Sequence, residues 1–162
     1  MSLVIFIKMR VIIKPINISY RKLLLDDVET LVEIEKLNNR QTWSSAHFSS
    51  SIVDKNTLSI GLVAERRLIG YALALIVPES ADLLNIGIQP NYKRQGYGEV
   101  LLNYLLVQLK KANVRALILE VGVENHIAIN FYQKLGFEVF GIREKYYSNR
   151  EDAKIMKLHI PY

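Results

Sequence analysis

The residues best suited to chemistry lie between Lys93 and Gly98, in the segment Lys-Arg-Gln-Gly-Tyr-Gly. This segment follows a strand pattern and opens a long helix pattern. Two glycines let a ligand approach the backbone closely, and the free N–H groups and dipole of a helix N-terminus attract an anion, to which Arg94 adds positive charge. We therefore predict a pyrophosphate site; the alternative is a tight strand-to-helix turn without a ligand. The segment lacks the Gly-Lys-Ser/Thr of a Walker loop and the three glycines of a dinucleotide-binding turn.

A second candidate is Glu120, the only charged residue in the apolar run 116–121. A carboxylate that loses its water without gaining a partner is costly, so Glu120 lies either on a solvated cleft face or where it is needed for function. In a cleft it could act as a general base, directly or through a water, toward an attacking ammonium. A terminal α-amine, with a pKa of about 7.7–8.0, needs less help than a lysine at about 10.4, which favours an N-terminal acceptor. A simple surface glutamate remains the alternative.

The segment Arg94–Gly98 resembles the Arg/Gln-x-x-Gly-x-Gly/Ala motif with which the GCN5-related N-acetyltransferases (GNAT superfamily) bind acetyl-coenzyme A. The Leu-Glu-Val around Glu120, Asn125 and residues 128–137 resemble a second conserved block of that fold. The resemblance covers about residues 10–160. It implies direct acetyl transfer from the thioester to an amine, without a covalent enzyme intermediate.

A narrower resemblance is to the branch that acetylates the alanine of ribosomal proteins, the RimI-type branch. Trp43-Ser44, Tyr146-Tyr147 and the following Glu-Asp-Ala carry it. Two positions differ: Gln41-Thr42 stands where a proline often precedes Trp-Ser, and Gly122 stands where an arginine often follows Leu-Glu-Val. Both positions lie toward the peptide side of the site, so they bear on the acceptor and not on the cofactor.

The resemblance implies roles for individual residues. Tyr132 would donate a proton to the departing coenzyme A thiolate, although its place on an apolar helical stripe also fits a core tyrosine. Asn125 would approach the cofactor as well as cap a helix. Trp43, Tyr146 and Tyr147 would line the acceptor groove, unless they are ordinary loop anchors. The residues expected at the cofactor are Ile86, Gly87, Ile88, Arg94, Gln95, Gly96, Tyr97, Gly98, Glu99 and Asn125; the backbone of the first three would run beside the pantetheine arm.

Hydrophobic periodicity predicts the elements that must position these residues. Helices are expected from Asp26-Asp27 to Asn38-Asn39, after a capping Ser44 or Ser45, over residues 97–112, and between a capping Asn125 and Gly136. Strands are expected over residues 10–18, 58–64, 68–77, 81–89, 116–121, 137–144 and 152–159. Within the strand 81–89, Gly87 predicts a bulge or a close approach by another backbone.

This order predicts one α/β (α+β) domain over residues 1–162, with its core at about 10–160 and residues 1–8 unassigned. In the fold that the resemblance implies, about four helices flank a central, largely antiparallel sheet. The fourth and fifth main strands of that sheet run parallel and splay to admit acetyl-coenzyme A.

Composition excludes several other kinds of protein. The 162 residues carry a net charge of +5, from 21 Lys and Arg against 16 Asp and Glu, with no cysteine and three histidines. We expect no disulfide, no thiolate nucleophile and no metal. No apolar run approaches the roughly 18 residues needed to span a membrane, which predicts a cytoplasmic protein. The basic residues lack interleaved aromatics, so no direct nucleic-acid partner is expected; we expect a monomer or weak dimer.

Two alternatives to N-terminal acetylation stay open. One keeps the chemistry but transfers the acetyl group to a lysine side chain, a polyamine or an antibiotic amine. The other is a non-catalytic acyl-coenzyme A sensor or a basic RNA-associated module. The presence of both Glu120 and Tyr132 argues against the sensor.

Overall fold

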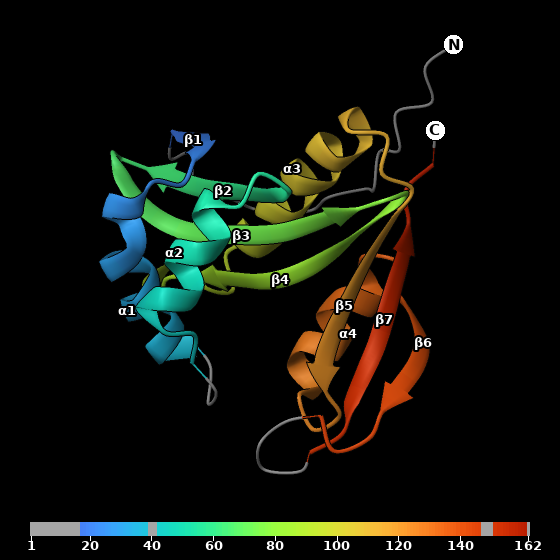
Figure 1. Ribbon diagram of the computed structural model, residues 1–162. Coiled ribbons are helices and arrows are strands. Elements are labelled where there is room, and N and C mark those ends of the chain that lie inside the picture. Colours follow the sequence, from blue (N-terminus) through green and yellow to red (C-terminus); the bar gives the residue numbers. More distant parts are fainter. Residues whose placement is uncertain (1–16, 39–41, 147–150, 162) are drawn as a thin grey trace.

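The computed structural model describes residues 17–38, 42–146 and 151–161 (Figure 1). The strands are β1 (Ile18–Lys22), β2 (Thr57–Ala64), β3 (Arg67–Val77), β4 (Ser80–Ile88), β5 (Ala116–Gly122), β6 (Glu138–Arg143) and β7 (Ala153–His159). The helices are α1 (Val28–Asn38), α2 (Ser45–Val53), α3 (Tyr97–Lys111) and α4 (His126–Lys134), with short 3-10 turns η1 (Leu25–Asp27) and η2 (Pro90–Tyr92). None of these helices is long and apolar enough to cross a membrane.

All seven described strands form one sheet, in the order β1-β2-β3-β4-β5-β7-β6. Every neighbouring pair is antiparallel except β4 and β5, which are parallel. These two strands pair with each other only where Ser80–Asp82 lies beside Ala116–Ile118. Both strands continue beyond that point, but no longer as neighbours of each other. Figure 1 shows them diverging from a common end. The splayed parallel pair predicted from the sequence is confirmed, and it divides the sheet into a β1–β4 part and a β5–β7–β6 part.

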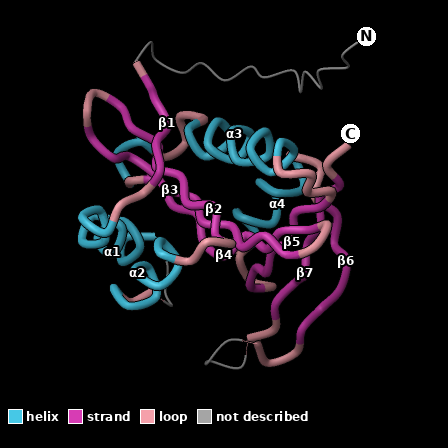
Figure 2. The backbone as a smooth tube through the Cα atoms, turned by 45° about the horizontal axis from the view of Figure 1, so that its top comes forward, coloured by secondary structure: helices cyan, strands magenta, loops and turns pink. Residues whose placement is uncertain are grey.

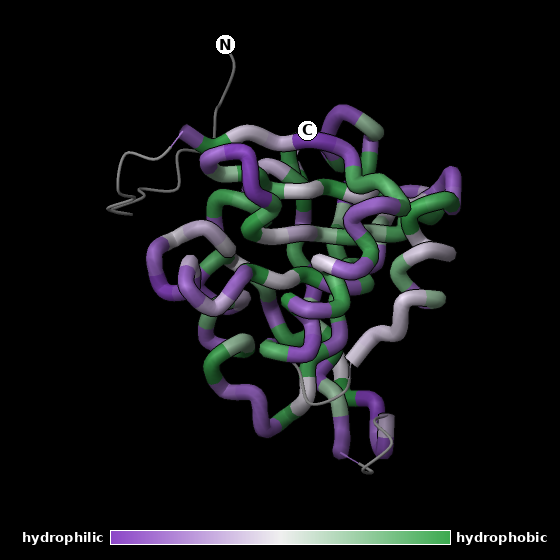
Figure 3. The backbone as a smooth tube through the Cα atoms, turned by 90° about the vertical axis from the view of Figure 1, so that its left-hand side faces the viewer, coloured by the Kyte–Doolittle hydropathy of each residue, from purple (hydrophilic) through white to green (hydrophobic). Residues whose placement is uncertain are grey.

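The helices cover the two faces of the sheet separately. Figure 2 shows α1 and α2 on one face and α3 and α4 on the other. The larger core lies under α3, where Leu101, Leu102, Leu105 and Leu109 are fully buried against the sheet. Removing each leucine side chain from water is worth roughly 1.5–3 kcal/mol. In Figure 3 the hydrophobic residues run through the central strands, while hydrophilic stretches lie mainly on the outer loops and helices.

The β2–β3 hairpin turns without a glycine. Glu65 and Arg66 both adopt positive φ, 48° and 67°, the conformation of a tight hairpin turn that suits the twist of the strands. Such a φ is uncommon for residues other than glycine. The hairpin predicted from the two apolar runs is therefore confirmed, although its turn chemistry is not the usual one.

The bulge predicted at Gly87 is wrong. The register between β3 and β4 shifts between Leu73 and Ala74, which leaves Leu84 as the extra residue of β4. Gly87 instead makes room for a ring: a Cβ atom there would lie 2.7 Å from Cε1 of Tyr71. The predicted close approach to Gly87 is present, but the group that approaches it is the side chain of Tyr71 and not another backbone.

The N-terminal strand predicted over residues 10–18 reaches the described residues only at its end. The first described strand is β1, which sequence patterns did not identify. Its half-buried residues, Ile18 and Tyr20, alternate with exposed ones, and Tyr20 stacks on Tyr104 of α3 with ring centroids 3.8 Å apart. Two apolar residues in five are too weak an alternation to stand out from a loop.

Candidate active site

The separation of β4 from β5 leaves one edge of β4 facing a gap. Residues 86–88 lie on this stretch, beyond Asp82, the last residue of β4 that pairs with β5. The amide of Gln89 bonds to Ile69 on β3, so alternation along the strand directs the backbone groups of Ile86 and Ile88 toward the gap. The carbonyl of Ile88 accepts a 3.0 Å bond from Nδ2 of Asn38. Ile86, Gly87 and Ile88 thus lie where a ligand could extend the sheet.

Glycine stands at the two positions of the Arg94–Gly98 segment for different structural reasons. Gly96 is the N-cap of α3 with φ 89°, a conformation that favours glycine, and Arg94 shares the left-handed region at φ 58°. Gly98 has no such requirement, because a Cβ atom there would make only ordinary contacts, 3.6 Å from Phe131 and 3.9 Å from Ile88. The turn therefore explains Gly96, whereas the fold itself does not require Gly98. A ligand close to the first turn of α3 would explain it.

The other residues predicted at the cofactor lie in this segment, in the first turn of α3 or at the start of α4. The Gln95 side chain donates a 2.8 Å bond to the carbonyl of Asn91, so it is engaged with the preceding turn. Tyr97 is buried, and its hydroxyl has no hydrogen-bond partner among the described residues. Glu99 is half-buried in the first turn of α3. Asn125 caps α4, accepting a 3.1 Å bond from the amide of Ala128, so its capping role is confirmed while its contact with a cofactor stays a prediction.

Glu120 lies on β5 just past the point where the strands part. Its neighbours Leu119 and Val121 point into the core, and Glu120 points to the opposite face of the sheet with 25% of its side chain exposed. Its carboxylate pairs with the guanidinium of Arg143, with Oε1 and Nη1 2.5 Å apart. Arg143 comes from β6 and reaches across β7, since both strands flank β7 in the sheet. Glu120 is therefore a partly buried, oriented carboxylate.

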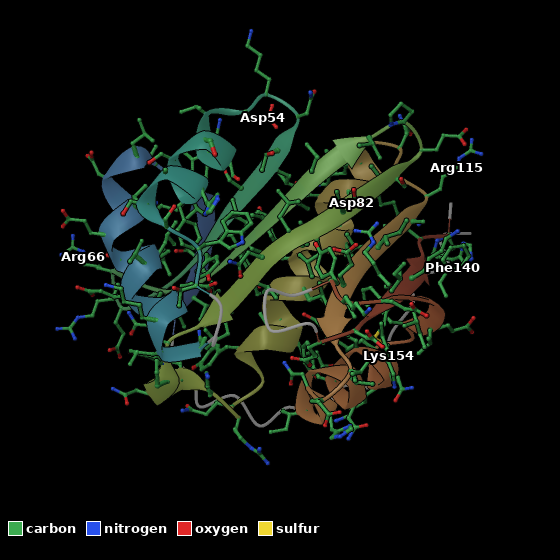
Figure 4. All side chains as sticks on the ribbon, turned by 60° about the horizontal axis from the view of Figure 1, so that its bottom comes forward. Asp54, Arg66, Asp82, Arg115, Phe140 and Lys154 are labelled. Carbon is green, nitrogen blue, oxygen red and sulfur yellow. The ribbon has the colours of Figure 1, made fainter. Side chains whose placement is uncertain are left out.

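Asp82 supplies a second carboxylate beside Glu120. Asp82 pairs with Ile118 in the parallel register, two residues before Glu120 on the same face, and Figure 4 shows it on β4 beside β5. Burial is the main cause that raises the pKa of Asp82, and the charge of Glu120 raises it further, while Arg143 acts in the opposite direction. Sequence patterns missed Asp82 and Arg143. Asp82 did carry a signal, as an isolated charge within a strand, but Arg143 is recognisable only once the strand order is known.

Tyr132 faces the larger core from α4. It is 8% exposed, and its ring lies 5.3 Å from that of Phe131 and 5.4 Å from that of Phe137. The apolar stripe predicted the buried ring correctly. The role of its hydroxyl as a proton donor stays a prediction.

The two described residues among those predicted to line the acceptor groove lie outside the strands, one before α2 and one after β6. Trp43 is half-buried directly before α2, with its ring 5.3 Å from Phe48. Tyr146 follows β6, is 42% exposed and lies under the Arg143 guanidinium, 5.1 Å away. Tyr147 lies outside the described residues. Figure 1 places the start of α2 and the end of β6 on either side of the gap between β4 and β5.

A buried carboxylate that the sequence did not single out lies behind Trp43. Glu35 of α1 is 1% exposed and accepts hydrogen bonds from the amide of Trp43, the hydroxyl of Tyr71 and the side-chain amide of Asn85. Its signal was a charged residue within the apolar periodicity of α1, beside the buried Leu31 and Ile34.

Comparison with known proteins agrees with this geometry. The family model described as "Acetyltransferase (GNAT) family" matches residues 25–137. The chain is similar to the ribosomal protein bS18-alanine N-acetyltransferase of Escherichia coli (strain K12), with 36% identity over 137 residues, 83% of this chain and 92% of that protein. It also resembles the crystal structure of the Escherichia coli ribosomal-protein-S18-alanine N-acetyltransferase, with a TM-score of 0.83, 34% identity and coverage of 90% and 96%. A third similar structure is the PaiA N-acetyltransferase of Thermoplasma acidophilum in complex with coenzyme A, with a TM-score of 0.73, 26% identity and coverage of 88% and 99%.

Proposed function

The chain belongs to the acetyltransferase (GNAT) family, and from this membership we propose that it acetylates the N-terminal α-amine of a protein, namely the N-terminal alanine of ribosomal protein bS18. The observation that supports this acceptor is the 36% identity to the Escherichia coli bS18-alanine enzyme, because that match spans 92% of the enzyme and not the cofactor motif alone. The donor of this family is acetyl-coenzyme A, which supplies an acetyl thioester.

The gap and the start of α3 fit this donor. The positive-φ turn at Arg94 and Gly96 leads into α3, whose first N–H groups have no partner within the helix, and Gly98 adds no side chain beside them. We assign the pyrophosphate to these N–H groups and to Arg94. The backbone of residues 86–88 would hold the pantetheine arm, because that edge of β4 has no strand beside it.

Glu120 accepts the proton that the acceptor ammonium loses before its nitrogen attacks. The ion pair with Arg143 supports this assignment, because it fixes the carboxylate at the point where β4 and β5 separate. Asp82 adds a second acidic group beside it, which suits a cationic amine.

Tyr132 donates its hydroxyl proton to the departing sulfur. The steps then balance: the ammonium gives one proton to Glu120, the N–C bond forms and the C–S bond breaks, and the sulfur receives a proton from Tyr132. The second proton, which the nitrogen loses after its attack, replaces the one that Tyr132 gave up. α4 supports the assignment by carrying Tyr132 in the same core cluster as Ile88 and Tyr97, the residues beside the predicted cofactor.

The test incubates the protein with acetyl-coenzyme A and each member of a panel of acceptors, and it measures the rate at which free thiol is released. The panel contains a peptide with the N-terminal sequence of bS18, the same peptide with a blocked N-terminus and an added internal lysine, and spermidine. We expect kcat/KM for the first peptide to exceed that of the others by at least about 100-fold, because roughly half or more of an α-amine is neutral at pH 8, against under about 1% of a lysine side chain. Equal turnover of the blocked peptide, or preference for spermidine, would contradict the proposed acceptor.

A further inference from the structure

Glu35 is a carboxylate almost fully removed from water. It lies on α1 with 1% of its surface exposed, among the apolar side chains that pack α1 against the sheet. Three donors converge on it: the hydroxyl of Tyr71 at 2.6 Å, Nδ2 of Asn85 at 3.1 Å and the backbone amide of Trp43 at 3.3 Å. An ionised carboxylate can be buried at modest cost only when such donors replace water.

The donors to Glu35 come from separate elements of the predicted site. Tyr71 is on β3, and burial first, then its bond to Glu35, raise the pKa of its hydroxyl far above the usual value, so it stays a donor. Asn85 directly follows the extra residue in β4, on the stretch that has left β5. Trp43 begins the segment that leads into α2. One carboxylate thus links α1, the central strands and the predicted acceptor side.

The ring of Tyr71 reaches Glu35 by crossing Gly87. A Cβ atom at Gly87 would lie 2.7 Å from the ring and 2.9 Å from its hydroxyl oxygen. The glycine in β4 is therefore required by this network as well as being close to the predicted cofactor. The network extends through Phe48, whose ring meets that of Tyr71 edge-on at 5.4 Å and that of Trp43 at 5.3 Å.

An apolar residue would fill this position with less desolvation, so stability alone is a poor explanation for a glutamate. What a glutamate provides here is a fixed position for the Trp43 backbone. Trp43 lies outside the helices and strands, so its amide makes no bond of regular secondary structure. Its bond to Glu35 connects it to β3 and β4, on which Tyr71 and Asn85 lie.

We propose that Glu35 is a positioning residue, which holds the Trp43 side of the acceptor groove in place against β3 and β4 and thereby sets the affinity for the acceptor. This inference rests on the proposed function, because it takes Trp43 to be part of the acceptor groove. It concerns acceptor binding and not the transfer step itself.

The test compares three variants of the full chain. Glu35→Leu removes the bond to Trp43 together with those to Tyr71 and Asn85, and it introduces an apolar side chain of similar size. Glu35→Gln is the conservative variant, because its amide oxygen can still accept from Trp43 and Asn85 while its NH₂ faces the Tyr71 oxygen. Tyr71→Phe is the matched control, since it deletes a bond to the same carboxylate but leaves the Trp43 bond intact.

The expected result is a split between acceptor and cofactor. Glu35→Leu should raise the acceptor KM about 10-fold or more, as the loss of one hydrogen bond to a charged group predicts, with kcat within about threefold of wild type. Its Kd for acetyl-coenzyme A, from calorimetry, should stay within about twofold. Glu35→Gln should restore most of the acceptor affinity, and Tyr71→Phe should lower Tm with the acceptor KM near normal. An unchanged acceptor KM in Glu35→Leu, or an equal rise in Tyr71→Phe, would overturn the inference.

A second measurement stays informative if the acceptor proves to be different. Hydrogen exchange at the Trp43 amide should be slow in the wild-type chain and faster by about 10-fold or more in Glu35→Leu. A fast-exchanging amide in the wild-type chain would overturn the positioning role whatever the acceptor. If the wild-type chain fails to turn over any N-terminal peptide while this amide is protected, the proposed acceptor is wrong and the role of Glu35 stands.

Discussion

At the scale of single residues, three charged side chains interact where β4 and β5 separate: Asp82, Glu120 and Arg143. The sequence could identify Glu120, because a lone charge in a short apolar strand is visible without any knowledge of the fold. It could not identify Arg143, since its contact with Glu120 depends on β7 lying between β5 and β6, although β7 is last in the chain. Glu35 was missed for a related reason: its donors come from positions 8, 36 and 50 residues away.

Replacing Glu120 with glutamine should lower kcat roughly 100-fold at neutral pH, because the general base is lost. The defect should shrink as pH rises, since more of the acceptor amine is then already neutral. Initial rates between pH 7 and 9 measure this, and calorimetry should show a nearly unchanged Kd for acetyl-coenzyme A. A defect below about threefold at every pH would make Glu120 an ordinary surface residue.

Tyr132→Phe deletes one oxygen and keeps the ring packed between Phe131 and Phe137. A proton donor to the departing sulfur acts only as the C–S bond breaks, so the loss should fall on kcat by about 100-fold, with both KM values little changed. The matched control is Tyr104→Phe, which removes a tyrosine oxygen from the ring pair with Tyr20. Full activity of Tyr132→Phe with a lowered Tm would end the proton-donor assignment.

The Asp82→Asn variant tests whether the pKa of Asp82 is raised, because a raised pKa makes the stability of the fold depend on pH. The raised pKa means that folded protein binds this proton more tightly than unfolded protein, so stability falls as pH rises from the ordinary value of 3.8 through the raised one. Asp82→Asn should therefore raise Tm at pH 7, and the gain should fade as pH approaches 4. Asp27→Asn should show the opposite sign, because hydrogen bonding to Arg21 lowers the pKa of Asp27 and stabilises the fold above that pKa. A Tm loss at pH 7 in Asp82→Asn would contradict this account.

At the scale of elements, the start of α3 is the part that sequence analysis described best. Helix periodicity, the two glycines and the preceding strand are all local features, so the segment and its helix could be predicted together. Local features also predicted α1, α2, α4 and the hairpin. They failed at Gly87, because a glycine made necessary by a ring on the neighbouring strand looks the same in sequence as one at a bulge.

Gly98→Val should weaken acetyl-coenzyme A binding by about 10-fold or more, as the loss of one charge-assisted contact predicts. Gly98→Ala is the control for the fold, since a Cβ atom there makes only ordinary contacts with Phe131 and Ile88. Gly98→Ala should therefore melt close to the wild-type Tm in the absence of ligand, and a cooperative melt shows that Gly98→Val is folded. Unchanged affinity in a folded Gly98→Val variant would remove the pyrophosphate site from this turn.

At the scale of the whole molecule, the proposed active site depends on one topological feature: two parallel strands that share three residue pairs and then separate. Composition and element order indicated an α/β domain, and resemblance to a family supplied the splayed pair. The order of the last two strands and the contacts across β7 depend on long-range pairing that no local pattern encodes. The fold was therefore predictable in outline, and the individual site residues were predictable only where a local signal marked them.

The most direct test of the whole account is to find which atom of intact bS18 receives the acetyl group. The protein would be incubated with purified bS18 and acetyl-coenzyme A, beside the Glu120→Gln variant as a control, and the product mapped by tandem mass spectrometry. We predict one acetyl group on the N-terminal alanine, formed by the wild-type chain at a rate roughly 100-fold above that of the variant. Acetylation at lysine side chains, or equal rates for the two chains, would contradict it.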